Sequence, residues 1–446
     1  MSKFALLFLM VFFGGILASL IYSGSYAFAL YQLIYFLNPD NRWWSSSIPG
    51  LRYSFIVVLL MMGILFKNYQ RYSAVSPWNR QPILKWLAAL LVMYYVAYTF
   101  AINMPMHNRF TFDFTKLVII MFIAYKLIDT EKAFNISLWG YVVGCFYIGY
   151  LATITGRNAG NRLEGIGMID APEANGTAAA LVPAAVILLY FAWQGNLKVK
   201  LMAGLMGAFI ANALVLINSR GSFLGVVVSL GCYLMFMMFS RYQKKGQRGT
   251  AVFMIVVGLS GAYYMTDDLF WERMSTLKEV EEGSRESGAS RTVFWLTTFD
   301  MLEDHPLGLG VRGYNTLAPL YMDDETRGGE LYRSVHSTWF QGLSEVGFIG
   351  FSFFLAMLFT AYRLTRRAKL QMIKEGRYEI YFKILAIECA LLGFLVAATF
   401  IDRFRAEILY WMILFLALAS KFYYLHNPEV KAPAPKRAPT LAKIGE

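Results

Sequence analysis

Long runs of apolar residues constrain this chain more than any other feature of its sequence. A helix needs about 20 such residues to cross a membrane. Because a chain in lipid must satisfy its own backbone hydrogen bonds, these runs predict helices. Beyond residue 37 the runs lie near 51–66, 84–102, 114–128, 134–155, 174–193, 200–217, 221–240, 250–265, 339–362, 380–401 and 406–425. The sequence therefore predicts an all-α fold, a polytopic helical bundle in a membrane.

The composition agrees with this class. Hydrophobic residues make up 57% of the 446 residues and charged residues only 16%, whereas soluble domains carry about 25% charged residues. The cysteines, Cys145, Cys232 and Cys389, all fall inside apolar runs. They are expected to be buried small hydrophobic residues, without the spacing of a disulfide framework or a metal site.

The net charge of +12 raises the possibility of a nucleic-acid partner, but the position of the charges argues against one. Lysine and arginine fill short loops between apolar runs, at 67–85, 241–248 and 363–377. The positive-inside rule places such loops in the cytoplasm. Alternation then puts the following loops on the outer side: 103–113, 156–173, 218–220, 266–338 and 402–405.

Residues 1–37 allow two readings, either two spans or one crossing interrupted around Tyr22–Ser25. The broken crossing gives about twelve spans with both ends in the cytoplasm, which Lys3 favours. Four regions follow from this map. They are an N-terminal transmembrane bundle (1–265), a large outer loop (266–335), C-terminal transmembrane helices (336–426) and a disordered basic cytoplasmic tail (427–446).

The outer loop is the one long non-membrane segment, and an insertion of this length is more often functional than idle. Its sequence favours helices at 267–282 and 290–303. The breakers His305-Pro306, Gly308, Gly310 and Gly313 follow the second helix. We therefore expect a partly helical insertion.

Arginines gather at the outer membrane edge. A charge there costs several kcal/mol unless it is paired or solvated, although arginines also extend to lipid headgroups. The guanidinium fork suits phosphate oxygens and keeps its charge, so a lipid-linked diphosphate is the expected ligand. The candidates are Arg157, Arg162, Arg220, Arg291 and Arg333.

Two acidic clusters offer the alternative of a metal. They are Asp323-Asp324-Glu325 and Asp267-Asp268. Neither has the separated spacing of a known calcium or magnesium site. Solvated loop charge explains both, and we expect no metal and no cofactor.

His336 stands where a polar stretch gives way to an apolar one, in SVHSTWFQGLSEVGFIG (334–350). A neutral histidine, with a pKa of about 6.5, can accept the proton of an attacking sugar hydroxyl. The alternative is an interfacial histidine that caps a helix. Gln341 and Glu345 follow and, with Arg333, are supporting candidates. On one regular helix Glu345 would lie about two and a half turns below His336, too far for contact.

Three segments carry a resemblance to a known family: NSRGSFLGVVVSL (218–230), SRTVFWLTTFDMLEDHPLGLGVRGYN (290–315) and HSTWFQGLSEVGFIGF (336–351). Together and in this order they resemble the core of the O-antigen ligase family, the lipopolysaccharide ligases and their polymerase relatives. The N-terminal stretch FLNPDNRWW (36–44) resembles a subgroup of polysaccharide polymerases and ligases.

The resemblance implies an enzyme of the bacterial inner membrane that faces the periplasm. Such enzymes transfer a glycan from undecaprenyl diphosphate with inversion and without a metal. The family's histidine falls on His336 and its arginines on Arg220 and Arg291, with Arg162 or Arg157 added by loop position. We expect the acceptor to be lipid A-core oligosaccharide, as in the ligases. The alternatives are a second lipid-linked glycan, a protein hydroxyl, or a flippase of lipid-linked sugars, which needs no base.

Overall fold

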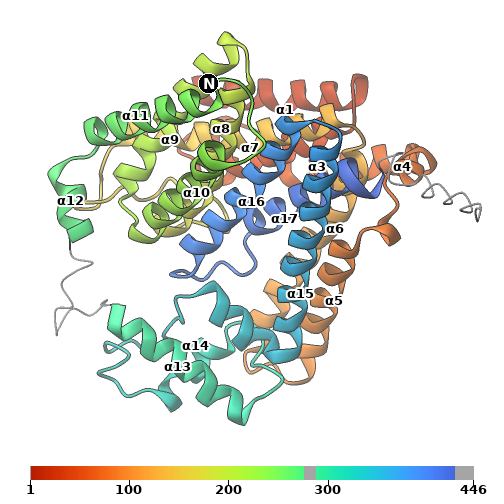
Figure 1. Ribbon diagram of the computed structural model, residues 1–446. Helices are drawn as coiled ribbons and strands as arrows, with labels where there is room; N and C mark the ends of the chain where they lie inside the picture. The colour runs from red at the N-terminus through yellow and green to blue at the C-terminus, as the bar shows by residue number, and fades with distance from the viewer. Residues whose placement is uncertain (1, 276–287, 427–446) are drawn as a thin grey trace, which may run out of the picture.

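A computed structural model describes residues 2–275 and 288–426 of the chain. The predicted disordered tail lies outside the described residues, as does the end of the helix predicted at 267–282. Within the described part the regular elements are all helices, joined by loops, and the β-structure is limited to two isolated bridges between residues 159 and 171. Figure 1 shows the helices gathered into one bundle, with α13 and α14 at its lower end. The all-α prediction is confirmed for these residues.

The α-helices follow one another along the chain with these bounds: α1 (Lys3–Ile21), α2 (Ser25–Leu37), α3 (Tyr53–Lys67), α4 (Tyr69–Val75), α5 (Pro82–Val96), α6 (Met104–Leu127), α7 (Glu131–Thr155), α8 (Ala174–Gln194), α9 (Leu197–Ile217), α10 (Arg220–Phe239), α11 (Gln247–Met265), α12 (Asp268–Ser275), α13 (Gly288–Asp304), α14 (Gly313–Tyr321), α15 (Thr338–Lys374), α16 (Tyr378–Ala398) and α17 (Glu407–Ser420).

Nine helices of the described residues are long and apolar enough to cross a membrane. The number rises to ten if the bent pair Tyr53–Lys67 and Tyr69–Arg80 counts as one span. A polytopic helical membrane protein is thus supported, with fewer candidate spans than the predicted twelve. Helix α6 carries several charged residues along its length, and α2 has only 13 residues. The predicted interruption between α1 and α2 is present at residues 22–24.

The centre of the bundle is formed by α17 and the helices around it. All residues of α17 from Ile408 to Ser420 are buried. The Trp411 ring contacts the rings of Tyr35, Phe36 and Tyr141 at centroid distances of 4.9–6.3 Å. Large aromatic side chains bury much surface in such edge-to-face contacts, which hold the first turns of α17 in place.

Small residues let α10 approach α16 closely. A Cβ atom added to Gly225 would lie 2.5 Å from the carbonyl oxygen of Gly393. Helices in membranes associate through close packing of this kind, because lipid tails are as apolar as the side chains they replace. This contact places the first residue of α10 beside the loop 399–406 that follows α16.

Helix α15 is broken at Gly347, where φ is 62° and ψ is −173°. The turn after α13 fills the break. Leu309 donates its backbone N–H to the carbonyl of Ser344 (2.7 Å), and Gly310 donates to that of Glu345 (3.0 Å). The segments Pro306–Gly310 and Glu345–Gly347 therefore form one structural unit.

Helices α13 and α14 form a small cap with an apolar core of its own. Phe294, Met301, Tyr314 and Ala318 are buried in this core, and the Tyr314 hydroxyl donates to the carbonyl of Phe294 (2.7 Å). The bounds of α13 agree with the helix predicted at 290–303, and α13 ends before the predicted His-Pro breaker.

Candidate functional site

A cavity of about 960 Å³ opens at the end of the bundle that carries the cap and the loop 399–406. This volume lies within the range of small-molecule sites. Much of its lining is apolar and comes from α3 and α6, including Phe55, Val58, Met62, Phe112, Leu117, Ile119 and Ile120. The remaining lining is strongly polar. The cavity therefore suits a ligand with an apolar part and a charged or hydroxylated part.

The polar lining carries charges of both signs. Its basic residues are Arg52, Arg109, Lys116, Arg312, Arg403 and Arg405. Its acidic residues are Asp40, Asp113, Asp170, Glu173, Glu345, Asp402 and Glu407. Ion pairs join Arg405 to Glu345, Arg403 to Glu173 and Lys116 to Asp113. The first two pairs bring together helices and loops that are far apart in the sequence, whereas the third lies within α6.

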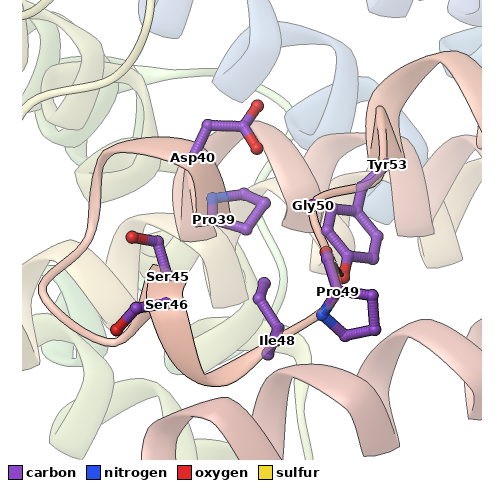
Figure 2. Close-up of a pocket in the computed structure, with 8 residues that line it drawn as sticks. All are labelled: Pro39, Asp40, Ser45, Ser46, Ile48, Pro49, Gly50 and Tyr53. Atoms are coloured by element: carbon purple, nitrogen blue, oxygen red, sulfur yellow. Dashed lines mark hydrogen bonds between the residues drawn. The ribbon is translucent and has the colours of Figure 1, made fainter.

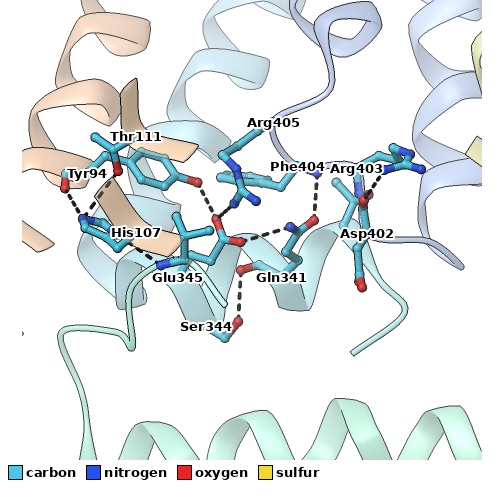
Figure 3. A network of polar contacts seen from close by, with 12 residues as sticks. Tyr94, His107, Thr111, Gln341, Ser344, Glu345, Asp402, Arg403, Phe404 and Arg405 are labelled. Carbon is cyan, nitrogen blue, oxygen red and sulfur yellow. Dashed lines mark hydrogen bonds and ion pairs between the residues drawn. The ribbon is translucent and has the colours of Figure 1, made fainter. Parts of the chain in front are cut away.

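Glu345 is the centre of a buried polar network beside the cavity (Figure 3). Its carboxylate pairs with Arg405 and accepts hydrogen bonds from the Tyr94 hydroxyl (2.7 Å) and the Gln341 amide (3.0 Å). Only 5% of the Glu345 side chain and 13% of the Arg405 side chain are exposed. A buried ion pair is tolerated when further hydrogen bonds satisfy its lone pairs. Gln341 and Glu345 therefore hold the cavity wall in shape.

His336 does not lie on this helix. Helix α15 begins at Thr338, and His336 precedes it with φ at 51°, in the left-handed region. The expectation that His336 and Glu345 share one regular helix is wrong. A residue other than glycine in this conformation needs surrounding contacts to hold it, and such residues cluster at functional sites.

Asp402 supplies those contacts. Its carboxylate accepts the hydroxyl of Ser334 and the backbone N–H of Ser337 (3.0 Å), so it binds residues on both sides of His336. Burial raises the pKa of the Asp402 carboxyl, whereas the Ser334 hydrogen bond and the charge of His336 lower it. Asp402 lines the cavity. His336 thus stands beside a half-buried carboxylate that lines the cavity.

Arg333 and Arg291 belong to the same neighbourhood through Phe294 of α13. The Arg333 guanidinium lies 4.8 Å from the centre of the Phe294 ring, and the His336 ring lies 6.4 Å from it. Arg291 is three residues before Phe294 on the helix, and residues three apart share a face. Arg291 therefore shares a face of α13 with Phe294, whose ring lies near His336.

Arg220 approaches the site from α10. A Cβ atom on its neighbour Gly221 would lie 3.2 Å from the Phe400 ring. The Trp295 ring of α13 lies 6.4 Å from the same phenylalanine. The loop that carries Asp402 is thus flanked by the start of α10 and by α13, whereas Arg220, Arg291 and His336 are not among the residues that line the cavity.

Arg162 and Arg157 have partners within the fold. Arg162 donates to the side-chain oxygen of Asn175 (2.7 Å) and to the carbonyl of Ile217 (3.3 Å), three residues before Arg220. Arg157 forms an ion pair with Asp267 at the start of α12 and lowers the pKa of that carboxyl. Arg162 remains near the predicted diphosphate site, whereas Arg157 anchors the short helix.

The sequence reasoning missed the charged residues of the loop after α16. Asp402, Arg403 and Arg405 lie in IDRFRAE, between two apolar runs. Three charges in so short a connection at the membrane edge were a usable signal, because intramembrane charges mark sites by default. Arg312 was also missed. It lines the cavity and has φ at 62°.

The acidic clusters considered for a metal have other roles. Asp324 pairs with Arg327 and Asp267 with Arg157. Across residues 2–275 and 288–426, no three histidine, cysteine or acidic side chains lie together in a way that could hold a metal ion.

Comparison with known proteins agrees with the sequence motifs. A sequence model of the family described as O-Antigen ligase matches residues 205–355. This range contains α10, the cap and the start of α15. No curated protein matches the chain. The family match supports an O-antigen ligase-like family, and that prediction is confirmed.

Proposed function

Because residues 205–355 match the O-antigen ligase family, we propose that the protein is a membrane glycosyltransferase that moves a glycan from undecaprenyl diphosphate to lipid A-core oligosaccharide. The observation that carries this proposal is Asp402, which lines a cavity with a long apolar wall and binds the residues on both sides of His336. We place the reaction at the periplasmic face of the bacterial inner membrane, because the positive-inside rule puts the loops rich in lysine and arginine in the cytoplasm.

The two parts of the cavity lining match the two parts of such a donor. The apolar wall from α3 and α6 suits the polyprenyl chain, and the polar end suits a diphosphate and its sugars. Arg220 and Arg291 bind the diphosphate through charge-assisted hydrogen bonds. Arg162 and Arg333 support these two arginines. Arg157 belongs to the same predicted set, but it forms an ion pair with Asp267.

The proposed reaction is a single displacement. His336 accepts the proton of an acceptor hydroxyl while its oxygen attacks the anomeric carbon of the donor. The bond from this carbon to the diphosphate oxygen breaks, and the diphosphate leaves with the electron pair. Attack from the face opposite the leaving group inverts the anomeric configuration. Guanidinium groups offset the charge that develops on the leaving oxygen.

Asp402 acts through His336 in this scheme. Its negative charge favours the protonated imidazole that forms during attack, and its bonds to Ser334 and Ser337 hold the left-handed turn. A buried carboxylate that orients a histidine is a recurring device in proton transfer. Asp402 is therefore a positioning residue.

A polymerase or a protein ligase would use the same residues with another acceptor. A flippase would bind the same donor but would need no base. The acceptor is decided by offering lipid A-core, a second lipid-linked glycan and a hydroxyl-bearing peptide to the purified protein in nanodiscs. Product on lipid A-core alone is the expected result.

The mechanism is tested by His336→Ala, with His305→Ala as the matched control at the end of α13. Loss of a positioned base costs about 10²–10⁴-fold in rate, so His336→Ala should lose single-turnover transfer and keep its donor affinity. Arg220→Ala and Arg291→Ala should weaken donor binding as well, since hydrogen bonds to charged groups contribute about 1.5–3 kcal/mol each. Transfer by His336→Ala at the wild-type rate would sink the proposal.

A further inference from the structure

Part of the cavity lining takes no part in the transfer step described above. Helix α2 contributes Tyr31 and Tyr35, the loop before α8 contributes Asp170, and α17 begins with Glu407. The Tyr35 hydroxyl donates to Asp170, and the Tyr31 hydroxyl donates to Glu407 (2.8 Å). The backbone N–H of Glu407 donates to Asp170 (2.8 Å). These four residues form one connected surface, the tyrosine–carboxylate wall.

The two carboxylates keep unused capacity to accept hydrogen bonds. A carboxylate offers about four lone-pair sites. The bonds named above occupy two sites on Asp170 and one on Glu407. Their oxygen atoms are already held in place by the tyrosines and by the backbone. A ligand that donates hydrogen bonds would therefore meet acceptors that lose little freedom on binding.

Arg403 lines the same cavity. It pairs with Glu173, and its Nη1 donates to the carbonyl of Asp402 (3.2 Å). Its Nε atom is buried and has no hydrogen-bond partner among the residues that the structure describes. This atom packs against Gly176 of α8, since a Cβ atom added there would lie 2.5 Å from it. Arg403 is therefore fixed in the cavity wall by its partners and by α8.

The charges and hydrogen-bonding groups of this surface determine which class of ligand it can bind. An anion would be repelled by the Asp170 and Glu407 carboxylates, whereas the charge of Glu173 is offset by its ion pair with Arg403. A metal ion would need a set of converging ligands, and the described residues hold none. A neutral molecule rich in hydroxyl groups fits, because each hydroxyl both donates and accepts.

A second, smaller cavity adjoins the large one. It measures about 330 Å³ and is formed by the segment between α2 and α3, including Asp40, Ser45, Ser46 and Tyr53 (Figure 2). Asp40 and Tyr53 also line the large cavity. The two cavities therefore share a border, and hydroxyl and carboxylate groups extend beyond the large one.

We propose that the tyrosine–carboxylate wall, Arg403 and the adjoining small cavity form a sugar-binding subsite, which holds successive neutral sugar units through their hydroxyl groups. This inference rests on the proposed function and assigns residues to the glycan, whereas the diphosphate is bound elsewhere in the same site. The glycan belongs either to the donor lipid or to the acceptor, and the experiment separates these two sources.

The test compares two lipids with the full-length protein in nanodiscs. One is undecaprenyl diphosphate without sugar, and the other is undecaprenyl diphosphate carrying the glycan purified from the source cells. We expect the wild type to bind the glycan-bearing lipid more tightly than the sugar-free lipid. Each carboxylate that binds a sugar hydroxyl should contribute about a tenfold gain in affinity, which is the effect of one charge-assisted hydrogen bond. Asp170→Asn and Glu407→Gln should each lose this advantage and keep the affinity for the sugar-free lipid.

Two further variants control for folding and for general charge effects. Asp40→Asn changes an exposed residue at the shared border and should reduce the same advantage without altering the unfolding temperature. Glu164→Gln makes a similar change on the loop 156–173 outside both cavities and should change neither affinity. If the variants lose affinity for lipid A-core and keep that for the donor, the subsite holds the acceptor glycan.

The outcomes separate this inference from the proposed function. If folded Asp170→Asn, Glu407→Gln and Asp40→Asn retain the full wild-type affinities for glycan-bearing donor and for lipid A-core, the sugar subsite is refuted. If the wild type binds neither undecaprenyl lipid, the proposed function itself is refuted, and with it the subsite that rests on it.

Discussion

Gly347→Ala tests whether the cap is locked onto the break in α15. The backbone at Gly347, with φ at 62° and ψ at −173°, lies in a region that is open almost only to glycine, and forcing another residue there costs about 1–3 kcal/mol. The new methyl group would also lie 2.4 Å from the carbonyl carbon of Leu307 and 2.5 Å from its oxygen. These are backbone atoms, so no side chain can rotate out of the way.

The turn must therefore move off the helix. Leu309 and Gly310 would then lose their backbone hydrogen bonds to α15, each worth about 1 kcal/mol. The local cost is about 3–5 kcal/mol in total. That is large for one substitution, since most cost about 0.5–3 kcal/mol.

The assay combines thermal unfolding in nanodiscs with hydrogen exchange at Leu309 and Gly310. Gly347→Ala should lower the unfolding temperature by several degrees and should expose both amides to exchange. Gly63→Ala is the matched control, because no atom lies within 4 Å of the added Cβ on α3. Alanine there should stabilise the helix by about 0.5–1 kcal/mol. Wild-type unfolding and protection in Gly347→Ala would refute the docking of the turn.

Two further predictions concern the charged groups of the cavity. Glu345→Gln and Arg405→Met should each destabilise the protein by about 3–5 kcal/mol, because each leaves a buried charge without its partner; the double variant should cost less than the two single effects together, and strict additivity of the unfolding free energies would contradict a direct pair. Chelators should leave glycan transfer intact, because guanidinium groups neutralise the leaving diphosphate; loss with EDTA and recovery with magnesium would show that a metal takes this role instead.

Much of the fold followed from the sequence because partition between lipid and water is a local property. The hydropathy of about 20 residues decides whether a segment enters the membrane, so the apolar runs correspond to helices. Breakers act locally too. The interruption at Tyr22–Ser25 and the end of α13 before His305 therefore lie where the sequence predicted them.

The number of spans was harder to predict. Helix α6 continues the apolar run at 114–128 back through charged residues to Met104, and α2 is a short helix with most of its residues buried. Hydropathy cannot distinguish a lipid-facing helix from one that is buried by its neighbours, because both environments are apolar.

For the candidate site, the sequence alone indicated the residue types and their order along the chain. His336, Arg220 and Arg291 stand out because charged or titratable groups are rare at the edge of apolar runs. The contact of Asp402 with Ser334 and Ser337 spans more than sixty residues and leaves no local pattern. The pairing of Arg405 with Glu345 is of the same kind. Only packing determines how helices rotate and which loops meet, so only the tertiary structure decided that His336 stands off its helix and that the cavity joins an apolar wall to carboxylates and tyrosines.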